Sequence, residues 1–358
     1  MKTLVLCGIA AALPCACSGG AGTPQPLPLA GGAGLSASST VVRARPAAQT
    51  PPPDAVVSGR VMDLSSYDPD VRAGGGPGWS VLANGTPARG VAPVRGAYVL
   101  VGPYPIDGAT PPPVLPPGDE MAVTDAAGRF SLRVPLGQAG VVYPGEVYWL
   151  DVFPSSADQV HRAVIHRTLS LAAGNNVLPE ATTLLAAVTR DEVAYLRGIN
   201  ADRARFGAPP LLLDETMLES ARYWAHFMAT TGYFAHCIPA ASCTPGATAT
   251  PPPVYGPQDV SPAARDAYFH DTFGSSGENI AAGYPSWSSA EAMMMAERAF
   301  CPGGSPVGCP QSERTAHFLN IVNGSFNWGG VAIATHGMGG NYYDTEFWSL
   351  QSIYRDRY

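Results

Sequence analysis

The spacing of apolar residues changes near residue 180, and this change divides the chain into two folding units. Before that point, short apolar runs such as Val56–Val61, Arg129–Val134 and Val147–Phe153 alternate with turns rich in Gly, Pro and Asp. Runs of this kind, without helical spacing, are typical of short strands. Their regular succession favours an all-β sandwich of the transthyretin or immunoglobulin type. We therefore expect residues 55–180 to form an all-β domain.

Apolar residues in the second half of the chain recur at helical spacing. Thr189 and Glu192 can form a capping box at the start of one helix. Asp214 can cap a second helix, and Gly232 can end it. Three further elements are expected: a helix over Ser289–Phe300 and strands over Trp328–Thr335 and Asn341–Leu350. Helices followed by late strands predict an α+β domain.

The first 17 residues have the form of an export signal. Lys2 precedes a short apolar run that is too short to span a bilayer as a helix. The end of this segment resembles a lipoprotein signal in which Cys17 is acylated, and secretion without an anchor is the alternative. Residues 18–54 are rich in Ala, Gly, Ser, Pro and Thr, which predicts an extended tether. We expect an exported protein that is secreted or held by a lipid at the outer membrane or cell surface.

The charged residues exclude several classes of protein. Lys2 is the only lysine, and the formal net charge is −7. Without an internal lysine the chain can hold neither a P-loop lysine, nor a kinase lysine, nor a Schiff-base lysine. The acidic balance and the lack of an arginine cluster argue against nucleic acid as a partner.

Four cysteines lie beyond the leader, and export favours disulfides between them. Three pairings are possible. The short spacings favour two local loops, Cys237–Cys243 and Cys301–Cys309. A zinc site that uses all four thiolates is the alternative, but the C-x5-C and C-x7-C spacings are unfavourable for zinc.

Five blocks of the second half follow one family in the family's order. They are INADRARFGAPPLLLDETMLESARYWAHFMATTGYFAH (Ile199–His236), GENIAAG (Gly277–Gly283), AERAF (Ala296–Phe300), HFLNIVNGSFNWGGVAIA (His317–Ala334) and NYYDTEFWS (Asn341–Ser349). In these blocks residues 181–358 resemble the CAP superfamily of cysteine-rich secretory, antigen 5 and pathogenesis-related proteins, and its bacterial members above all. The resemblance implies an α-β-α sandwich around a small sheet.

The first half carries a second resemblance. Its segments SGRV, APVRGAYVLV and TDAAGRFSLRV are similar to the carboxypeptidase regulatory-like β-sandwich. That resemblance implies a non-catalytic accessory module.

The CAP resemblance implies a cleft lined by two histidines and two glutamates, which here are His236, Glu278, Glu297 and His317. Two neutral imidazoles, those of His236 and His317, can bind zinc while carboxylates hold the bound water. Three roles stay open for these residues: a metal site, a hydrogen-bonded cluster that supports the fold or positions a ligand, and a catalytic site. The segment between His236 and Glu278 is long for the family, and we expect a disulfide-pinned loop near the rim of the cleft.

These observations favour a binding protein over an enzyme. We expect a lipid, peptide or envelope ligand in the cleft, with a zinc ion as the one cofactor that the residues suggest. One alternative is a peptidase-like metal hydrolase with His236 and His317 as ligands and a glutamate as base. The other is an adhesion or envelope-structural protein with a vestigial cleft. The sequence contains neither an HExxH helix nor a G-x-S-x-G turn.

Overall fold

The computed structural model describes most of the two expected domains. The described residues are 53–63, 92–136, 147–158, 160–232, 234–236, 262, 276–336 and 340–348. The export signal with Cys17, almost all of the tether, and both Cys237 and Cys243 lie outside them. The described parts contain no helix that is long and apolar enough to cross a membrane.

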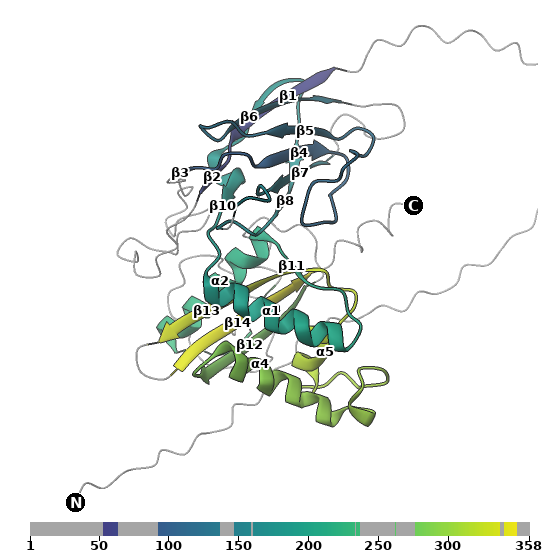
Figure 1. Ribbon diagram of the computed structural model, residues 1–358, viewed down its shortest axis with the longest axis vertical. Helices are drawn as coiled ribbons and strands as arrows, with labels where there is room; N and C mark the ends of the chain where they lie inside the picture. Colours follow the sequence, from purple (N-terminus) through teal and green to yellow (C-terminus); the bar gives the residue numbers. More distant parts are fainter. Residues whose placement is uncertain are drawn as a thin grey trace, which may run out of the picture.

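The regular elements in the described part of the N-terminal half are short strands, with one 3-10 helix, η2 (Glu180–Thr183), near its end (Figure 1). The strands are β1 (Asp54–Arg60), β2 (Met62–Asp63), β3 (Ala92–Pro93), β4 (Tyr98–Gly102), β5 (Glu120–Val123), β6 (Arg129–Pro135), β7 (Val147–Phe153), β8 (Ile165–Ser170), β9 (Gly174–Val177) and β10 (Leu184–Leu185). They form sheets in the orders β6-β1-β9, β5-β4-β7-β8 and β10-β2-β3. The strands expected near β1, β6 and β7 are therefore present.

Local turn chemistry sets the start of β6. The Asp125 carboxylate accepts hydrogen bonds from the backbone N–H groups of Ala127 and Arg129. Gly128 follows with a φ of 71°, a conformation that a side chain would disfavour. The turn places alternate residues of β6 in an apolar core that β1, β4, β7 and β8 share.

The C-terminal half combines one sheet with helices on both of its faces. Its elements are α1 (Arg190–Arg205), β11 (Leu212–Leu213), α2 (Glu215–Thr231), β12 (Ser276–Tyr284), α4 (Trp287–Ala296), η4 (Glu297–Phe300), η5 (Pro302–Gly304), α5 (Ala316–Val322), β13 (Trp328–His336) and β14 (Gly340–Trp348). The strand order is β11-β13-β14-β12. Helix α2 packs on β13 and β14, whereas α1, α4 and α5 pack on one another over the other face.

The helix boundaries follow the expected capping residues. Thr189 and Glu192 form a complete capping box at α1, and the Asp214 carboxylate accepts the Met217 N–H at the start of α2. Gly232 ends α2 in the left-handed region. The third helix begins earlier than expected, because Ser286 supplies its N-cap.

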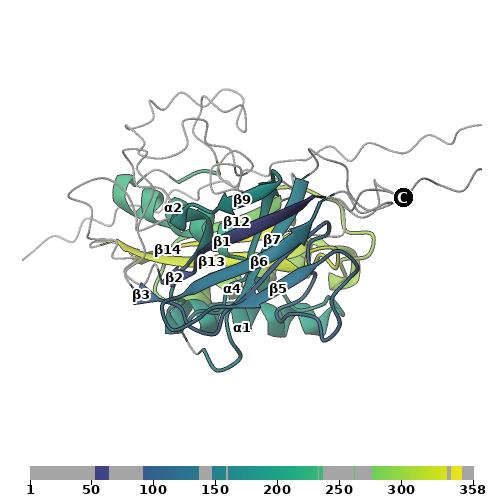
Figure 2. The same ribbon diagram turned by 90° about the horizontal axis from the view of Figure 1, so that it is seen from above.

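Two features of the C-terminal half were not predicted. The GENIAAG block lies inside strand β12 at the edge of the sheet. Helix α2 is buried over nearly its whole circumference. One side of α2 packs on β13 and β14. The first turns of α2 also contact β8 of the other half of the molecule. In Figure 2 the N-terminal strands overlie the C-terminal sheet accordingly.

A buried arginine ties α1 to the segment around α5. The Arg203 side chain is fully buried and donates hydrogen bonds to four backbone carbonyls. These belong to Pro209, Ile321, Asn323 and Phe326. Burial lowers the pKa of Arg203 to about 10, and the guanidinium still carries its charge at neutral pH.

We expect Arg203→Leu to lower the free energy of unfolding by about 3 kcal/mol or more, because it leaves buried carbonyls without donors. Urea denaturation measures this loss. Arg205→Leu is the matched control: Arg205 lies on the same helix with an exposed side chain paired to Asp202. Its effect should stay within about 0.5 kcal/mol. Equal losses in the two variants would contradict the role assigned to Arg203.

Two carboxyl groups meet where α1 packs on α4. Gly198 leaves room for Glu291, since a Cβ on this glycine would clash with Glu291 Oε2. Burial, together with the charge of Asp202, raises the pKa of Glu291 to about 8. The folded state therefore keeps a proton that the unfolded chain releases from about pH 4.5 upward.

Glu291→Gln should consequently stabilise the protein at alkaline pH and change little at pH 4. The contribution of Glu291 to the free energy of unfolding falls as the pH rises from about 4.5 to 8, and the neutral amide removes that loss. We expect a gain of about 1–2 kcal/mol at pH 9, measured by urea denaturation at both pH values. The exposed Glu313→Gln variant serves as the control. A gain that is the same at pH 4 and pH 9 would refute the assignment.

Candidate functional site

The first histidine–glutamate pair joins the segment after α2 to the edge strand β12. His236 Nδ1 lies 2.5 Å from Glu278 Oε2. Both residues are buried, with exposures of 8% for His236 and 7% for Glu278. Glu278 sits near the start of β12, so the strand fixes the carboxylate to which the imidazole is held.

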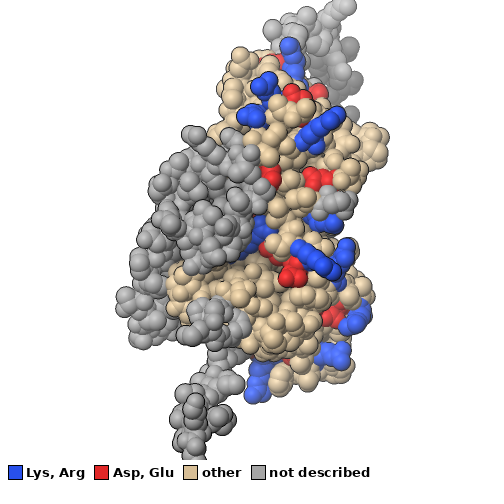
Figure 3. All heavy atoms as spheres, turned by 60° about the vertical axis from the view of Figure 1, so that its left-hand side comes forward, with Lys and Arg blue, Asp and Glu red and all other residues tan. Residues whose placement is uncertain are grey.

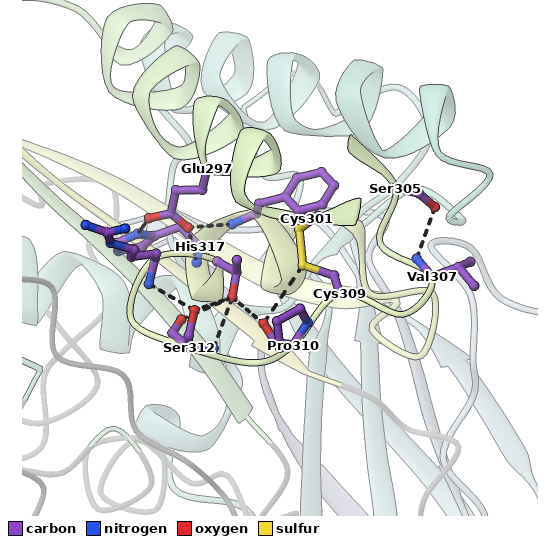
Figure 4. The surroundings of a disulfide bond; sticks show 11 residues. Glu297, Cys301, Ser305, Val307, Cys309, Pro310, Ser312 and His317 are labelled. Carbon is purple, nitrogen blue, oxygen red and sulfur yellow. Dashed lines mark hydrogen bonds and ion pairs between the residues drawn. A yellow bond between two sulfur atoms is a disulfide. The ribbon is translucent and has the colours of Figure 1, made fainter. Parts of the chain in front are cut away.

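The second pair joins η4 to α5. His317 Nδ1 lies 2.6 Å from Glu297 Oε1, and Figure 4 shows the two side chains pointing toward each other. The other carboxylate oxygen, Oε2, accepts the backbone N–H groups of His317 and Phe318 at 2.9 and 3.2 Å. These are orphan donors of the first turn of α5, and Thr315 at the N-cap offers them no side-chain bond. Glu297 therefore has two roles: it caps α5, and it orients the imidazole of His317.

Two asparagines connect the pairs. Asn279 follows Glu278 on β12, and its Nδ2 donates to the carbonyl of His317 at 3.0 Å. Asn320 Nδ2 donates to Asn279 Oδ1 at 2.9 Å and to the Glu278 carbonyl at 3.3 Å. Both pairs are thus held to neighbouring positions of one strand.

The four residues expected to line a cleft therefore form two carboxylate–imidazole pairs. Glu278, Glu297 and His317 lie on β12, η4 and α5, and His236 lies in the segment after α2. In a neutral imidazole of this kind, Nδ1–H donates a hydrogen bond to the carboxylate and the lone pair lies on Nε2. Outer carboxylates commonly orient metal-binding histidines in this way.

Additional carboxylates lie behind Glu278. Side-chain oxygens of Glu278, Asp344 and Glu346 lie within 4.8 Å of one another, and all three residues are buried. The β12–β14 register pairs Glu278 with Glu346 and Ile280 with Asp344, which brings the three carboxylates to one face. Ser220 of α2 donates to Glu346 Oε1. Sequence reasoning missed Asp344 and Glu346, although acidic residues two apart in a strand share a face.

One disulfide lies beside the second pair. Cys301 and Cys309 are bonded, as the short spacing predicted. The bond takes both thiolates out of the alternative four-cysteine zinc site. Cys301 directly follows η4, and the carbonyl of Pro310 accepts the Thr315 hydroxyl at 2.7 Å (Figure 4). The crosslinked loop therefore connects the elements that carry Glu297 and His317.

A hollow of about 300 Å³ lies next to the disulfide. It is lined by Pro306, Cys309, Gln311, Leu319, Asn320, Val322 and Asn323. None of the four histidines and glutamates lines it, so it is separate from the two pairs and shares only Asn320 with their supporting network.

The described surface carries charges of both signs. On the face that Figure 3 shows, arginines and acidic residues are interspersed over both halves of the molecule. No broad patch of a single charge appears among the described residues on this face.

The comparisons with known proteins bear on the C-terminal half. Residues 196–351 match the model of the CAP family, the cysteine-rich secretory protein family. The C-terminal domain is a CAP domain. The matched residues include all four members of the two pairs. No curated protein matches the chain.

Several solved structures resemble the chain at low sequence identity. An outer surface protein from Borrelia burgdorferi is 12% identical, with 45% of this chain and 93% of that chain covered and a TM-score of 0.33. The Schistosoma mansoni venom allergen-like protein 4 is 14% identical, with 45% and 90% covered and a TM-score of 0.29. An extracellular SCP-domain protein from Bacillus anthracis str. Ames is 12% identical, with 64% and 80% covered and a TM-score of 0.29.

We expect Asn279→Ala to destabilise the CAP domain by about 1–3 kcal/mol, because it leaves the His317 carbonyl and the Asn320 amide short of partners. Urea denaturation measures the change. Asn323→Ala is the control, since the Asn323 side chain accepts only the exposed Ser325 N–H. It should cost less than about 1 kcal/mol. If Asn323→Ala lowers the free energy of unfolding as much as Asn279→Ala does, the hydrogen bonds of Asn279 do not contribute to stability as proposed.

Proposed function

We propose that the CAP domain holds a divalent metal ion, zinc by its ligand chemistry, between His236 and His317. The observation that carries this proposal is the pairing of each Nδ1 with a buried carboxylate at 2.5 and 2.6 Å. A carboxylate that accepts from Nδ1 fixes the tautomer in which Nε2 can act as a ligand, and it increases the basicity of that nitrogen. When bound, the metal would offer a Lewis-acidic centre with positions open for an external ligand.

Electrostatics supports a cation at this place. Glu278 and Glu297 bring two carboxylates next to the imidazoles, and Asp344 and Glu346 add negative charge behind Glu278. Buried like charges repel one another, and a divalent cation relieves that repulsion. The chain supplies no lysine near the pairs, because Lys2 is its only one.

The hydrogen bonds favour binding over hydrolysis. Both oxygens of Glu297 are committed, one to the His317 imidazole and the other to two backbone N–H groups. A general base needs a carboxylate oxygen that can reach a bound water. In a metal hydrolase this role would fall to Glu278. We propose that the cleft binds a lipid, peptide or envelope ligand.

The cellular setting belongs to the same proposal. We propose an exported chain, anchored by a lipid on Cys17, with residues 18–54 as tether. Residues 55–180 would then form a carboxypeptidase regulatory-like β-sandwich, and residues 181–358 the CAP domain. The Cys301–Cys309 disulfide supports export, since such bonds persist mainly in oxidising compartments.

Titration calorimetry of the full chain with Zn²⁺ tests the metal site. We expect wild-type binding with a Kd in the micromolar range, about −8 kcal/mol, and no binding by the His236→Ala/His317→Ala variant. Glu278→Gln should weaken binding by about 10–100-fold, because it removes the carboxylate that orients His236.

His226→Ala is the control for this experiment. His226 lies on α2, where its ring contacts Thr230 one turn away, and its loss should leave the affinity unchanged. Wild-type protein that binds no Zn²⁺, or a double variant that binds as tightly as wild type, would refute the proposal.

A further inference from the structure

The two halves of the molecule meet in an interface with strand-like backbone pairing. The Val164 N–H donates to the Leu213 carbonyl at 2.8 Å, and the Glu215 N–H donates to the Val164 carbonyl at 2.9 Å. Apolar side chains from both halves pack beside these bonds. They are Leu100, Ile106, Phe153 and Val164 from the N-terminal half and Met217 and Trp328 from the CAP domain. We call this interface the junction.

The junction encloses a buried acid–base pair. His166 Nδ1 lies 2.5 Å from Asp151 Oδ1, and both side chains are almost fully buried. The His166 ring meets Trp328 of the CAP domain edge-to-face, with ring centroids 4.4 Å apart. The Trp328 indole N–H donates to Asp107 Oδ1. The pair therefore belongs to the N-terminal half but contacts the CAP domain directly.

A further carboxyl group lies close to this pair. The Asp119 carboxyl covers Gly102 on β4, where a Cβ would overlap with its Oδ1. Leu100, the neighbour of Gly102 on the same strand face, is paired with Asp151 across β4 and β7. Asp119 is 6% exposed, and neither carboxyl oxygen has a hydrogen-bond partner in the described part of the chain. A buried carboxyl without a donor strongly disfavours its ionised form.

The surroundings of both groups favour their protonated forms. Burial, with the charges of Asp151 and Glu120, raises the pKa of Asp119 to about 7. Burial alone would lower the pKa of His166, but its hydrogen bond with Asp151 and nearby acidic charges outweigh that effect and raise it. The acidic groups facing His166 are Asp151 on β7, Asp214 at the start of α2 and Asp107 in the loop after β4.

The remaining charges at the junction do not reverse the preference of Asp119 and His166 for their protonated forms. Arg167 follows His166 on β8 and lies 3.8 Å from Glu219 of α2, so its charge faces another carboxylate. Burial raises the pKa of Asp151 and of Asp214 as well. When Asp119 and His166 lose their protons, the junction gains negative charge beside acidic groups in a region of low dielectric constant.

We propose that the junction is a proton-dependent latch between the two halves of the molecule, closed while Asp119 and His166 are protonated and loosened when both are deprotonated. Both raised pKa values act in the same direction. The stabilisation from His166 is complete below about pH 6.5 and is lost as the pH rises through its folded pKa. The penalty for Asp119 grows as the pH rises from about 4 to 7. This inference does not depend on the proposed metal site.

Hydrogen–deuterium exchange of the full chain at pH 5.5 and 8.5 tests the latch. After correction for intrinsic exchange rates, the amides of Val164 and Glu215 report opening of the junction, and the β12–β14 pairing serves as the internal reference. Between the two pH values we expect opening in the wild type to increase by about tenfold or more. Asp119→Asn keeps the shape of the side chain but cannot ionise. In this variant the increase in junction opening between pH 5.5 and 8.5 should stay below about threefold.

Asp54→Asn is the matched control, because Asp54 pairs with Arg133 on the exposed face of β1 and β6. It should keep the wild-type response. Should Asp119→Asn fail to fold, the Trp328 indole N–H resonance of the wild type still tests the proposal, and we expect it to titrate between pH 5.5 and 8.5. A wild-type junction whose exchange does not depend on pH, an Asp119→Asn variant with the full response, or an indole resonance that does not titrate would each overturn the latch.

Discussion

Helix α2 lies between two sheets, and the rest of the structure depends on the hydrogen bonds and ion pairs that its buried polar side chains make there. Such side chains are shielded from water, so they need partners inside the protein. Arg222 binds Glu192 with two hydrogen bonds, at 2.8 and 2.7 Å. Glu215 accepts the Ala186 N–H, and Ser220 donates to Glu346. These partners lie on α1, on β14 and in the connection between the two halves. Helix α2 therefore links the helices and the sheet of the C-terminal half to the end of the N-terminal half.

The candidate site inherits its geometry from the same arrangement. One end of α2 starts at the junction with Asp214, and the other leads to His236. His236 then meets a carboxylate on β12, while His317 is held by Glu297 from η4. The elements β12, η4 and α5 and the segment after α2 each contribute one side chain. The asparagines of β12 and α5 join the two pairs through hydrogen bonds that are buried or partly buried.

Local signals in the sequence predicted the helix ends well, because a cap is a contact within four residues. Thr189 with Glu192, Asp214 and Gly232 all act as expected. Strand β12 could not be found this way. Its GENIAAG segment is rich in Gly and Ala, residues that carry little strand preference, and it becomes a strand because β14 offers a full edge to pair with.

The sequence by itself determined the family of the C-terminal domain, the capping residues of α1 and α2, and the local Cys301–Cys309 bond. Each of these depends on residue types or on short spacings. Only the tertiary structure decided which histidine meets which glutamate, that Asp344 and Glu346 lie close to Glu278, and that Asp119 and His166 are both buried near Asp151. Such contacts join residues far apart in the chain, and their energies depend on burial, which no local pattern specifies.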